Sequence, residues 1–248
     1  MSNVNSYTNR DPRYAGLAEW FRPERVLTGS AQVLLNPLVY ALEGAVGGVQ
    51  RRWRRERRRR LVGRSYDMAL EIARVLPRRL RVLDVGCGSG FIAHHLSALL
   101  GARVSGIDVR KSVDAPIDYA AFDGKHFPAQ DASFDAVLLC YVLHHAQDQP
   151  AFLREVRRVL RDGGLVLIYE DIPEAAWDAV ACRVHDRAWR ARTGPCTFRL
   201  WQDWRRVFTS SGFEVVSERR LSRWRNLTHP VRRGLYVLRT SDSRRHAV

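Results

Sequence analysis

The chain has 248 residues, of which 46% are hydrophobic and 27% are charged. A chain of this size can bury a full hydrophobic core, and it fits one domain with an appendage better than two equal domains. It contains no run of about 18 or more uncharged apolar residues, which excludes a conventional membrane-spanning helix.

The cysteines lie at positions 87, 140, 182 and 196, and none of them forms a CxxC pair or another metal-binding spacing. The polar start, MSNVNSYTNRDPRY, lacks the charged and then apolar plan of a secretory signal. We therefore expect a reduced, cytoplasmic protein without a structural metal.

The charge is strongly positive, with 41 lysines and arginines against 26 acidic residues and a net charge of +15. The run RRWRRERRRR at 51–60 is the densest concentration of arginine. One interpretation is a coding bias that places arginine wherever a basic surface residue is tolerated. The other is an anionic partner attracted by the positive field, which could be nucleic acid, anionic lipid or an acidic substrate.

If residues 51–60 form a helix, arginines surround it on every side, so it must be solvated or bound to anions. Beside the apolar stretch 31–50, such a helix could rest on an anionic membrane surface, where each arginine contributes about 1 kcal/mol. The helix could equally bind the phosphates of an RNA backbone, although the sequence contains no recognisable RNA-binding module. We favour a solvated surface helix and keep peripheral membrane association and nucleic acid binding as alternatives.

In chain order, residues 1–30 are expected to cross the surface as loop and short helix. Residues 31–50 are apolar but interrupted by Pro37 and Gly47–Gly48, which predicts short helices. Apolar residues then recur at helical spacing over SYDMALEIARVLP (65–77), which indicates a helix that faces a core and ends at its proline.

From residue 81 the pattern alternates between short apolar runs and amphipathic helices. The expected strands are RVLDV, ARVSGIDV, PIDYAAFD, FDAVLLC and LVLIYED. The expected helices include FIAHHLSALL and PAFLREVRRVLRDGG, the latter ending at Gly163–Gly164. Because the strands are almost continuously apolar, they predict a parallel sheet covered on both faces.

A helix over 173–192 interrupts this alternation and is followed by the loop TGPC and an amphipathic helix, FRLWQDWRRVFTSSG. The last two strands, FEVVSERRL and GLYVLRT, are separated by a long basic stretch. We therefore expect them to be antiparallel neighbours at one edge of the sheet.

The segment VLDVGCGSGF (82–91) is a strand that runs into GxGxG and then a helix. Glycines let a ligand approach the backbone of the turn, and the turn aims the free N–H groups of the following helix at that ligand. A dinucleotide-binding site typically has the pattern GxGxxG, whereas here the third glycine comes one residue earlier. Asp84 beside the loop suits a ligand with an ammonium and a sulfonium better than one with two phosphates.

Further carboxylates follow the next strands. Asp108 ends the second strand, where it can accept hydrogen bonds from both ribose hydroxyls. Asp123 ends the third strand beside Gly124, close enough to read the exocyclic amine of an adenine. Since open α/β sheets bind ligands at the carboxyl ends of their strands, these positions support one another.

Residues from about 62 to 170 resemble class I S-adenosylmethionine-dependent methyltransferases, especially the group that includes ubiquinone-type and small-molecule methyltransferases. VLDVGCGSG, IDV, FDGKHFPAQDASFD, VLLCYVLHH and LRDGGLVLIYED match the family motifs in order and spacing. The resemblance implies an α/β fold, a doubly wound Rossmann-like sheet of seven strands with the last strand antiparallel. It also implies S-adenosyl-L-methionine as the cofactor.

The resemblance assigns the cofactor-binding residues as well. Cys87, inside the loop, is expected to pack as a small residue and not to act as a nucleophile. The implied contacts are Asp84, Gly86, Cys87, Gly88 and Gly90 for the methionine part, Asp108 and Val109 for the ribose, Asp123 and Gly124 for the adenine, and Cys140 and Tyr141 near the transferred methyl group.

Methyl transfer needs an acceptor held in line with the sulfur–carbon bond, and only an acceptor that must lose a proton benefits from a general base. The candidate bases are His144 and His145 after the fourth strand, Glu170 at the end of the fifth, and His185. For each of them a structural role is the alternative interpretation.

Residues 172–198 follow the fifth strand, where an insertion overlies the site in this fold. We expect this insertion to form a cap together with an N-terminal helical extension, 1–60, while 61–248 form the methyltransferase domain. The stripe of Trp177, Val180, Val184 and Ala188 is interpreted as a packing face, and Phe198 and Trp201 as closing the cap.

The sequence therefore predicts an S-adenosylmethionine-dependent methyltransferase that acts on a small organic acceptor, without a metal. One alternative is an RNA methyltransferase that uses the basic surface. Another is a cofactor-binding protein that no longer catalyses.

Overall fold

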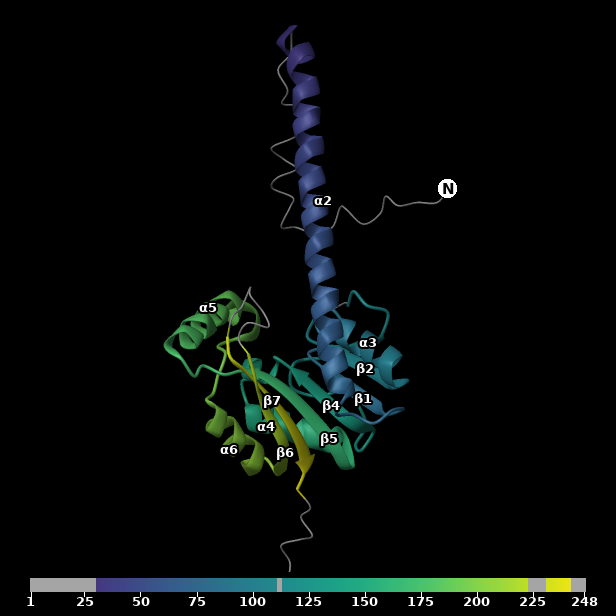
Figure 1. The fold of residues 1–248 in the computed structure, drawn as a ribbon, viewed down its shortest axis with the longest axis vertical. Helices are drawn as coiled ribbons and strands as arrows, with labels where there is room; N and C mark the ends of the chain where they lie inside the picture. The colour runs from purple at the N-terminus through teal and green to yellow at the C-terminus, as the bar shows by residue number, and fades with distance from the viewer. Residues whose placement is uncertain (1–29, 111–112, 223–230, 242–248) are drawn as a thin grey trace, which may run out of the picture. The chain divides into compact units, whose positions relative to one another are not determined.

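The computed structural model describes residues 30–110, 113–222 and 231–241 (Figure 1). The chain divides into two units, residues 1–60 and 61–248. The expectations for residues 1–29 and for the basic stretch 223–230 lie outside the described residues.

A sheet of seven strands lies within the second unit, in the order β3-β2-β1-β4-β5-β7-β6. Strands β1 to β5 are parallel, whereas β7 is antiparallel to both β5 and β6. This confirms the predicted sheet and the antiparallel pair at its edge. The strands are β1 (Arg81–Val85), β2 (Arg103–Asp108), β3 (Asp118–Ala121), β4 (Phe134–Cys140), β5 (Leu160–Asp171), β6 (Phe213–Leu221) and β7 (Arg233–Thr240).

Helices cover both faces of the sheet, because successive strand residues point to opposite sides. Val82 packs in the core covered by α3 and the last turns of α2, while its neighbour Leu83 packs in the core covered by α4 and α6. The helices are α2 (Ser30–Ala73), α3 (Phe91–Leu100), η3 (Leu143–His145), α4 (Gln149–Val159), α5 (Ala176–Thr193) and α6 (Trp201–Ser210).

The end of α2 is also tied to the sheet by polar contacts. The buried carboxylate of Glu71 accepts a hydrogen bond from the Tyr169 hydroxyl at 3.1 Å and pairs with Arg219. These contacts attach the last turns of α2 to β5 and β6, and the candidate site lies at the carboxyl ends of the central strands.

The predicted short helices over 31–50 are wrong, because α2 continues unbroken through Pro37 and Gly47–Gly48. A glycine inside a helix costs about 1 kcal/mol and a proline about 3 kcal/mol relative to alanine. The arginines that follow are good helix formers. The helix spans 44 residues despite these local costs.

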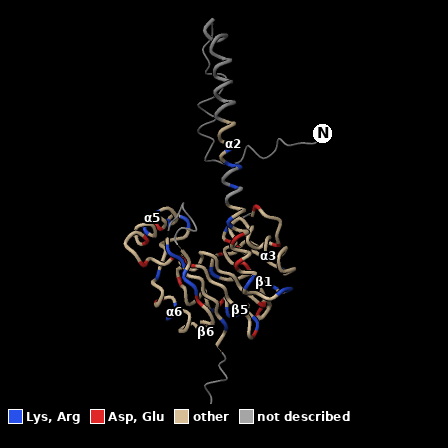
Figure 2. Tube along the Cα trace, in the orientation of Figure 1, with Lys and Arg blue, Asp and Glu red and all other residues tan. Residues whose placement is uncertain are grey.

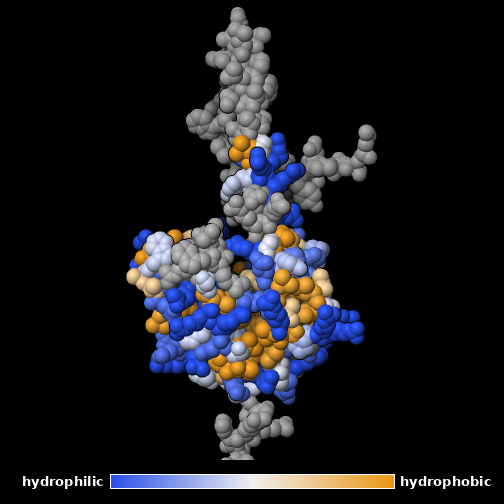
Figure 3. Space-filling view, viewed as in Figure 1, coloured by the Kyte–Doolittle hydropathy of each residue, from blue (hydrophilic) through white to orange (hydrophobic). Residues whose placement is uncertain are grey.

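The arginine run is helical as part of α2, and its described side chains are exposed. Figure 2 shows blue segments on this helix, and Figure 3 shows the corresponding atoms as hydrophilic. Trp53 lies among them with 62% of its surface exposed. None of the described helices has an apolar stretch long enough to cross a membrane.

The end of α4 also differs from the prediction. The helix ends at Val159, not at Gly163–Gly164, and β5 begins at Leu160, which pairs with Phe134. Gly163 adopts a φ of +73°, and a Cβ on Gly164 would lie 2.9 Å from the backbone oxygen of Asp135. The glycines thus belong to an irregular start of the strand, where the register shifts, and do not cap the helix.

The interpretation of the α5 stripe as a packing face is wrong as well. Trp177, Val180 and Val184 expose 57%, 40% and 62% of their surfaces, and Ala188 is exposed too. Instead, α5 is held from its opposite side, where Cys182 and Asp178 are buried. Asp178 accepts backbone hydrogen bonds from Ala175 at 3.0 Å and Arg232 at 3.2 Å, which fixes the start of the helix beside β7.

Candidate active site

The glycine loop joins β1 to α3 at the switch point of the sheet, between β1 and β4. Gly86, Gly88 and Gly90 have φ angles of +68°, +58° and +79°, which side chains rarely adopt. A Cβ on Gly86 would lie 2.2 Å from the side chain of Val142, whereas a Cβ on Gly88 would meet nothing within 4 Å. The loop is therefore packed tightly at its base and open at Gly88.

Asp84 lies just before this loop and is only 1% exposed. Among the residues that the structure describes, neither oxygen of its carboxylate has a hydrogen-bond partner. Burial, and then the negative charge of Asp108, raise the pKa of Asp84 to about 7. A buried carboxylate without a partner is costly, and a cationic ligand in the loop would compensate it, so these residues fit a cofactor with an ammonium group.

Asp108 ends β2 and faces the same loop. It accepts hydrogen bonds from the backbone amides of Gly88 at 2.8 Å and Arg110 at 2.9 Å. Each carboxylate oxygen has a second lone pair, so Asp108 can hold the loop and still accept from a diol. Next to it, Val109 exposes 55% of its surface and lies 3.3 Å from the position of a Cβ on Gly124, which provides an apolar surface for a flat ring.

Asp123 is engaged within its own loop. Its carboxylate accepts from the backbone amides of Lys125 and His126, both at 2.7 Å, and from the His126 ring at 2.7 Å. These hydrogen bonds, led by the His126 amide, lower the pKa of Asp123. Reading an adenine amine therefore requires Asp123 to use a second lone pair or to release His126.

Cys140 and Tyr141 follow at the end of β4. Burial, and then the charges of Asp84 and Glu170, raise the pKa of the Cys140 thiol, which disfavours the nucleophilic thiolate form. Tyr141 has a φ of +61°, a strained conformation for this residue type. Its amide donates to the carbonyl of Tyr169 at 2.9 Å, and this neighbouring strand holds the strained residue at the sheet edge.

His144 and Glu170 form a buried pair beside these residues, and neither side chain is exposed. The Nδ1 atom of His144 lies 2.6 Å from Oε2 of Glu170, and Oε1 accepts from the amides of Leu143 at 2.8 Å and His144 at 3.2 Å. Burial opposes protonation of His144, but Glu170 raises its pKa overall. Glu170 is fully buried, so it cannot contact a methyl acceptor directly, and its side chain contacts His144 instead.

His145 and His185 lie beside the pair of His144 and Glu170. The Nε2 atom of His185 lies 3.4 Å from Nε2 of His144 and 3.4 Å from Nε2 of His145. Burial, and then the adjacent His144 and His185, lower the pKa of His145 to about 3. The structure thus brings together all four candidate bases from three separate segments.

Cys196 joins this cluster and was missed as a site residue. Its Sγ atom lies 3.3 Å from Nδ1 of His145. Closely spaced cysteines are the pattern by which a sequence indicates a metal site, whereas this contact spans 51 positions. The ring of Phe198 stacks on that of His144 with 4.6 Å between the ring centroids, and the ring of Trp201 lies beside that of Tyr236. The role of Phe198 and Trp201 in closing a cap stays a prediction.

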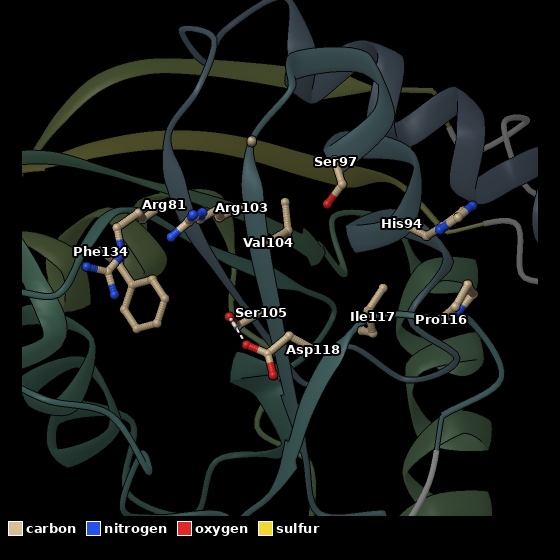
Figure 4. A pocket seen from close by; sticks show the side chains of 11 residues that line it. Arg81, His94, Ser97, Arg103, Val104, Ser105, Pro116, Ile117, Asp118 and Phe134 are labelled. Atoms are coloured by element: carbon tan, nitrogen blue, oxygen red, sulfur yellow. Dashed lines mark hydrogen bonds between the residues drawn. The ribbon is translucent and has the colours of Figure 1, made fainter.

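A cavity of about 450 Å³ lies elsewhere, at the amino ends of the first four strands (Figure 4). Arg81, Arg103, Asp118 and Phe134 each begin a strand and line it. Since open α/β sheets bind ligands at the opposite, carboxyl ends, this cavity is not the candidate site.

Part of the chain is similar to known proteins. Residues 83–168 match the family model described as a methyltransferase domain. A ubiquinone biosynthesis O-methyltransferase of Methylocella silvestris is 39% identical over 98 residues, which are 35% of this chain and 38% of that protein. The mitochondrial arginine-hydroxylase NDUFAF5 of Danio rerio is 33% identical over 111 residues, 42% of this chain and 34% of that protein. The matched region thus spans less than two fifths of these relatives' length.

Among solved structures, a SAM-dependent methyltransferase from Methanosarcina mazei superposes with a TM-score of 0.55 at 18% identity, covering 69% of this chain and 97% of that one. This likeness concerns the fold. Residues 83–168 therefore match a methyltransferase-domain family model, and the sheet that contains them has the same fold as this Methanosarcina mazei structure.

Proposed function

We propose that this protein is an S-adenosylmethionine-dependent methyltransferase and that its acceptor is a small organic molecule held under residues 172–198. The observation that carries the proposal is Asp84, a buried carboxylate beside the open end of the glycine loop that has no hydrogen-bond partner within the described part of the chain. Such a carboxylate attracts the ammonium group of the cofactor and repels the phosphates of a dinucleotide.

When bound, S-adenosylmethionine supplies a methyl group on a positively charged sulfur. The residues of this chain have to orient the acceptor and exclude water. Asp84 would bind the ammonium group, Asp108 the ribose hydroxyls, and Val109 with Gly124 would support the adenine. Tyr141, held in its strained conformation at the end of β4, would position the acceptor side.

A general base is not part of the proposal. Glu170 is fully buried, and both of its oxygens already accept hydrogen bonds. The ring of His144 is engaged on both sides, by Glu170 at Nδ1 and by His185 near Nε2. Positioning by the rigid ends of β4 and β5 is therefore the contribution that we assign to the chain.

Calorimetry with S-adenosylmethionine and its demethylated product tests the cofactor. Incubation with a radiolabelled methyl donor then tests a panel of phenols, carboxylic acids and amines. Mass spectrometry of the products separates methylation, a gain of CH2, from hydroxylation, a gain of oxygen, which the name of the Danio rerio relative makes worth measuring. Absence of cofactor binding would refute the proposal.

Two further outcomes correspond to the other candidate functions. Methylation of purified RNA with a steep salt dependence would favour a nucleic-acid methyltransferase, a reading that the exposed arginines of α2 support. Tight cofactor binding without turnover on small molecules or RNA would indicate a protein that binds the cofactor without catalysis.

A further inference from the structure

Four side chains that can ligate a metal converge beside the candidate active site: His144, His145, His185 and Cys196. One ligand atom from each lies within 4.8 Å of the others. They come from η3, from α5 and from the loop that follows α5.

The two distances from Nε2 of His185 to the Nε2 atoms of His144 and His145 match a tetrahedral site. With Zn–N distances of about 2.0–2.1 Å, two nitrogens at neighbouring corners of a tetrahedron lie about 3.4 Å apart. The Nε2 atom of His185 lies 3.4 Å from Nε2 of both His144 and His145. Closing the whole set from 4.8 Å onto an ion needs side-chain shifts of about 1 Å.

Glu170 prepares His144 for this role. Its carboxylate faces Nδ1 of His144 at 2.6 Å, which places the ring proton on that side and leaves the lone pair on Nε2, toward His185. Ligating histidines usually donate their other ring N–H to a carboxylate in this manner, and the carboxylate fixes the tautomer and the ring orientation. This accounts for the complete burial of a glutamate that cannot reach an acceptor.

Cys196 is positioned by a second set of contacts. Its amide donates to Asp186 at 2.8 Å. The loop around it is attached to the segment between η3 and α4, because Gln147 donates to the carbonyls of Thr193 at 2.8 Å and Pro195 at 3.2 Å. The thiol is thereby held 3.3 Å from the His145 ring before any ion arrives.

We propose that His144, His145, His185 and Cys196 bind one divalent transition-metal ion of the zinc type. Three imidazoles and one thiolate suit zinc and cobalt, whereas magnesium and calcium prefer oxygen ligands. Four protein ligands close the coordination sphere, which is typical of structural zinc sites. The ion fastens the middle of α5 and the loop after it to η3, which follows β4.

The proposal opposes the expectation from the sequence that no metal is present. It does not depend on the methyltransferase assignment, because metal binding is measured without the cofactor or an acceptor. Binding of the cofactor with no metal, or of the metal with no cofactor, would separate the two proposals.

The test uses the full chain, freed of metal with a chelator and titrated with Co2+. We expect one equivalent to bind per chain, with the visible bands of tetrahedral cobalt and a near-ultraviolet band from thiolate to cobalt. Zn2+ should displace the cobalt, and elemental analysis of freshly purified protein should find stoichiometric zinc.

Cys196→Ser should abolish the thiolate band, while Cys182→Ala should retain it. Cys182 is the matched control because it is buried on α5 outside the cluster. Glu170→Gln should retain one equivalent but bind it about 10–100-fold more weakly, as expected for loss of a supporting carboxylate.

Wild-type protein that binds no cobalt or zinc at micromolar concentration would overturn the proposal, and the cluster would then be held by hydrogen bonds alone. A thiolate band that persists in Cys196→Ser would also overturn it. If Cys196→Ser does not fold, His185→Asn provides the second variant, and it should lose the tetrahedral spectrum while remaining folded as judged by circular dichroism.

Discussion

Gly88→Arg tests the cofactor site most directly, because the chain contains a matched control in Gly101→Arg. Both glycines have nearly the same conformation, with φ angles of +58° and +59°, and a Cβ on either would meet nothing within 4 Å. Gly88 lies in the loop after β1, whereas Gly101 caps the far end of α3. The two substitutions therefore impose similar backbone strain at different places.

An L-residue in this left-handed conformation costs roughly 1–2 kcal/mol. In a chain of this size that lowers the melting temperature by about 2–8 °C for either variant. Only Gly88→Arg places a long cationic side chain where the cofactor would lie, beside Asp84 and Asp108. We expect its affinity for S-adenosylmethionine to fall at least about a hundredfold, or roughly 3 kcal/mol, while Gly101→Arg binds as the wild type does.

Calorimetric titration with the cofactor and thermal melts of the three proteins provide the measurement. Wild-type affinity in both variants would show that the space beside Gly88 is not the binding site. A loss of binding in Gly101→Arg as great as that in Gly88→Arg would show that strain in α3, and not occupation of the site, is responsible.

The other predictions concern charge burial and packing. Because the pKa of Asp84 is raised to about 7 in the native state from 3.8, the folded protein keeps a proton that the unfolded chain releases, so stability is lost as the pH rises from about 4 to 7. Asp84→Asn should raise the melting temperature at pH 8 but not at about pH 4. It should also abolish cofactor binding, and a variant that binds normally would contradict this role. In the wild type, cofactor binding should tighten as the pH rises through about 7. Trp204→Ala removes a fully buried ring stacked on Phe208 and should cost about 3–5 kcal/mol in urea unfolding. Trp177→Ala, at 57% exposure, should stay within about 0.5 kcal/mol of the wild type, and a larger loss would mean that α5 is covered.

The sequence was sufficient for the sheet and for the glycine loop because both depend on local patterns. Near-continuous apolar runs predict buried parallel strands, and glycines at alternate positions predict a turn with positive φ angles. Asp84 and Asp108 were found for the same reason, since each lies at a fixed place relative to a strand end. The boundary of α4 was missed because Gly163–Gly164 serve an irregular strand as readily as a helix cap.

The histidine cluster needed the tertiary structure. His144 and His145 are neighbours in the chain, but His185 reaches them from 41 and 40 positions away, and Cys196 from 51 positions beyond His145. No periodicity within a single segment encodes such a meeting. It is decided by the contacts that α5 and its following loop make with η3. The tertiary structure also shows that Glu170 contacts His144 and that the apolar stripe of α5 faces outward.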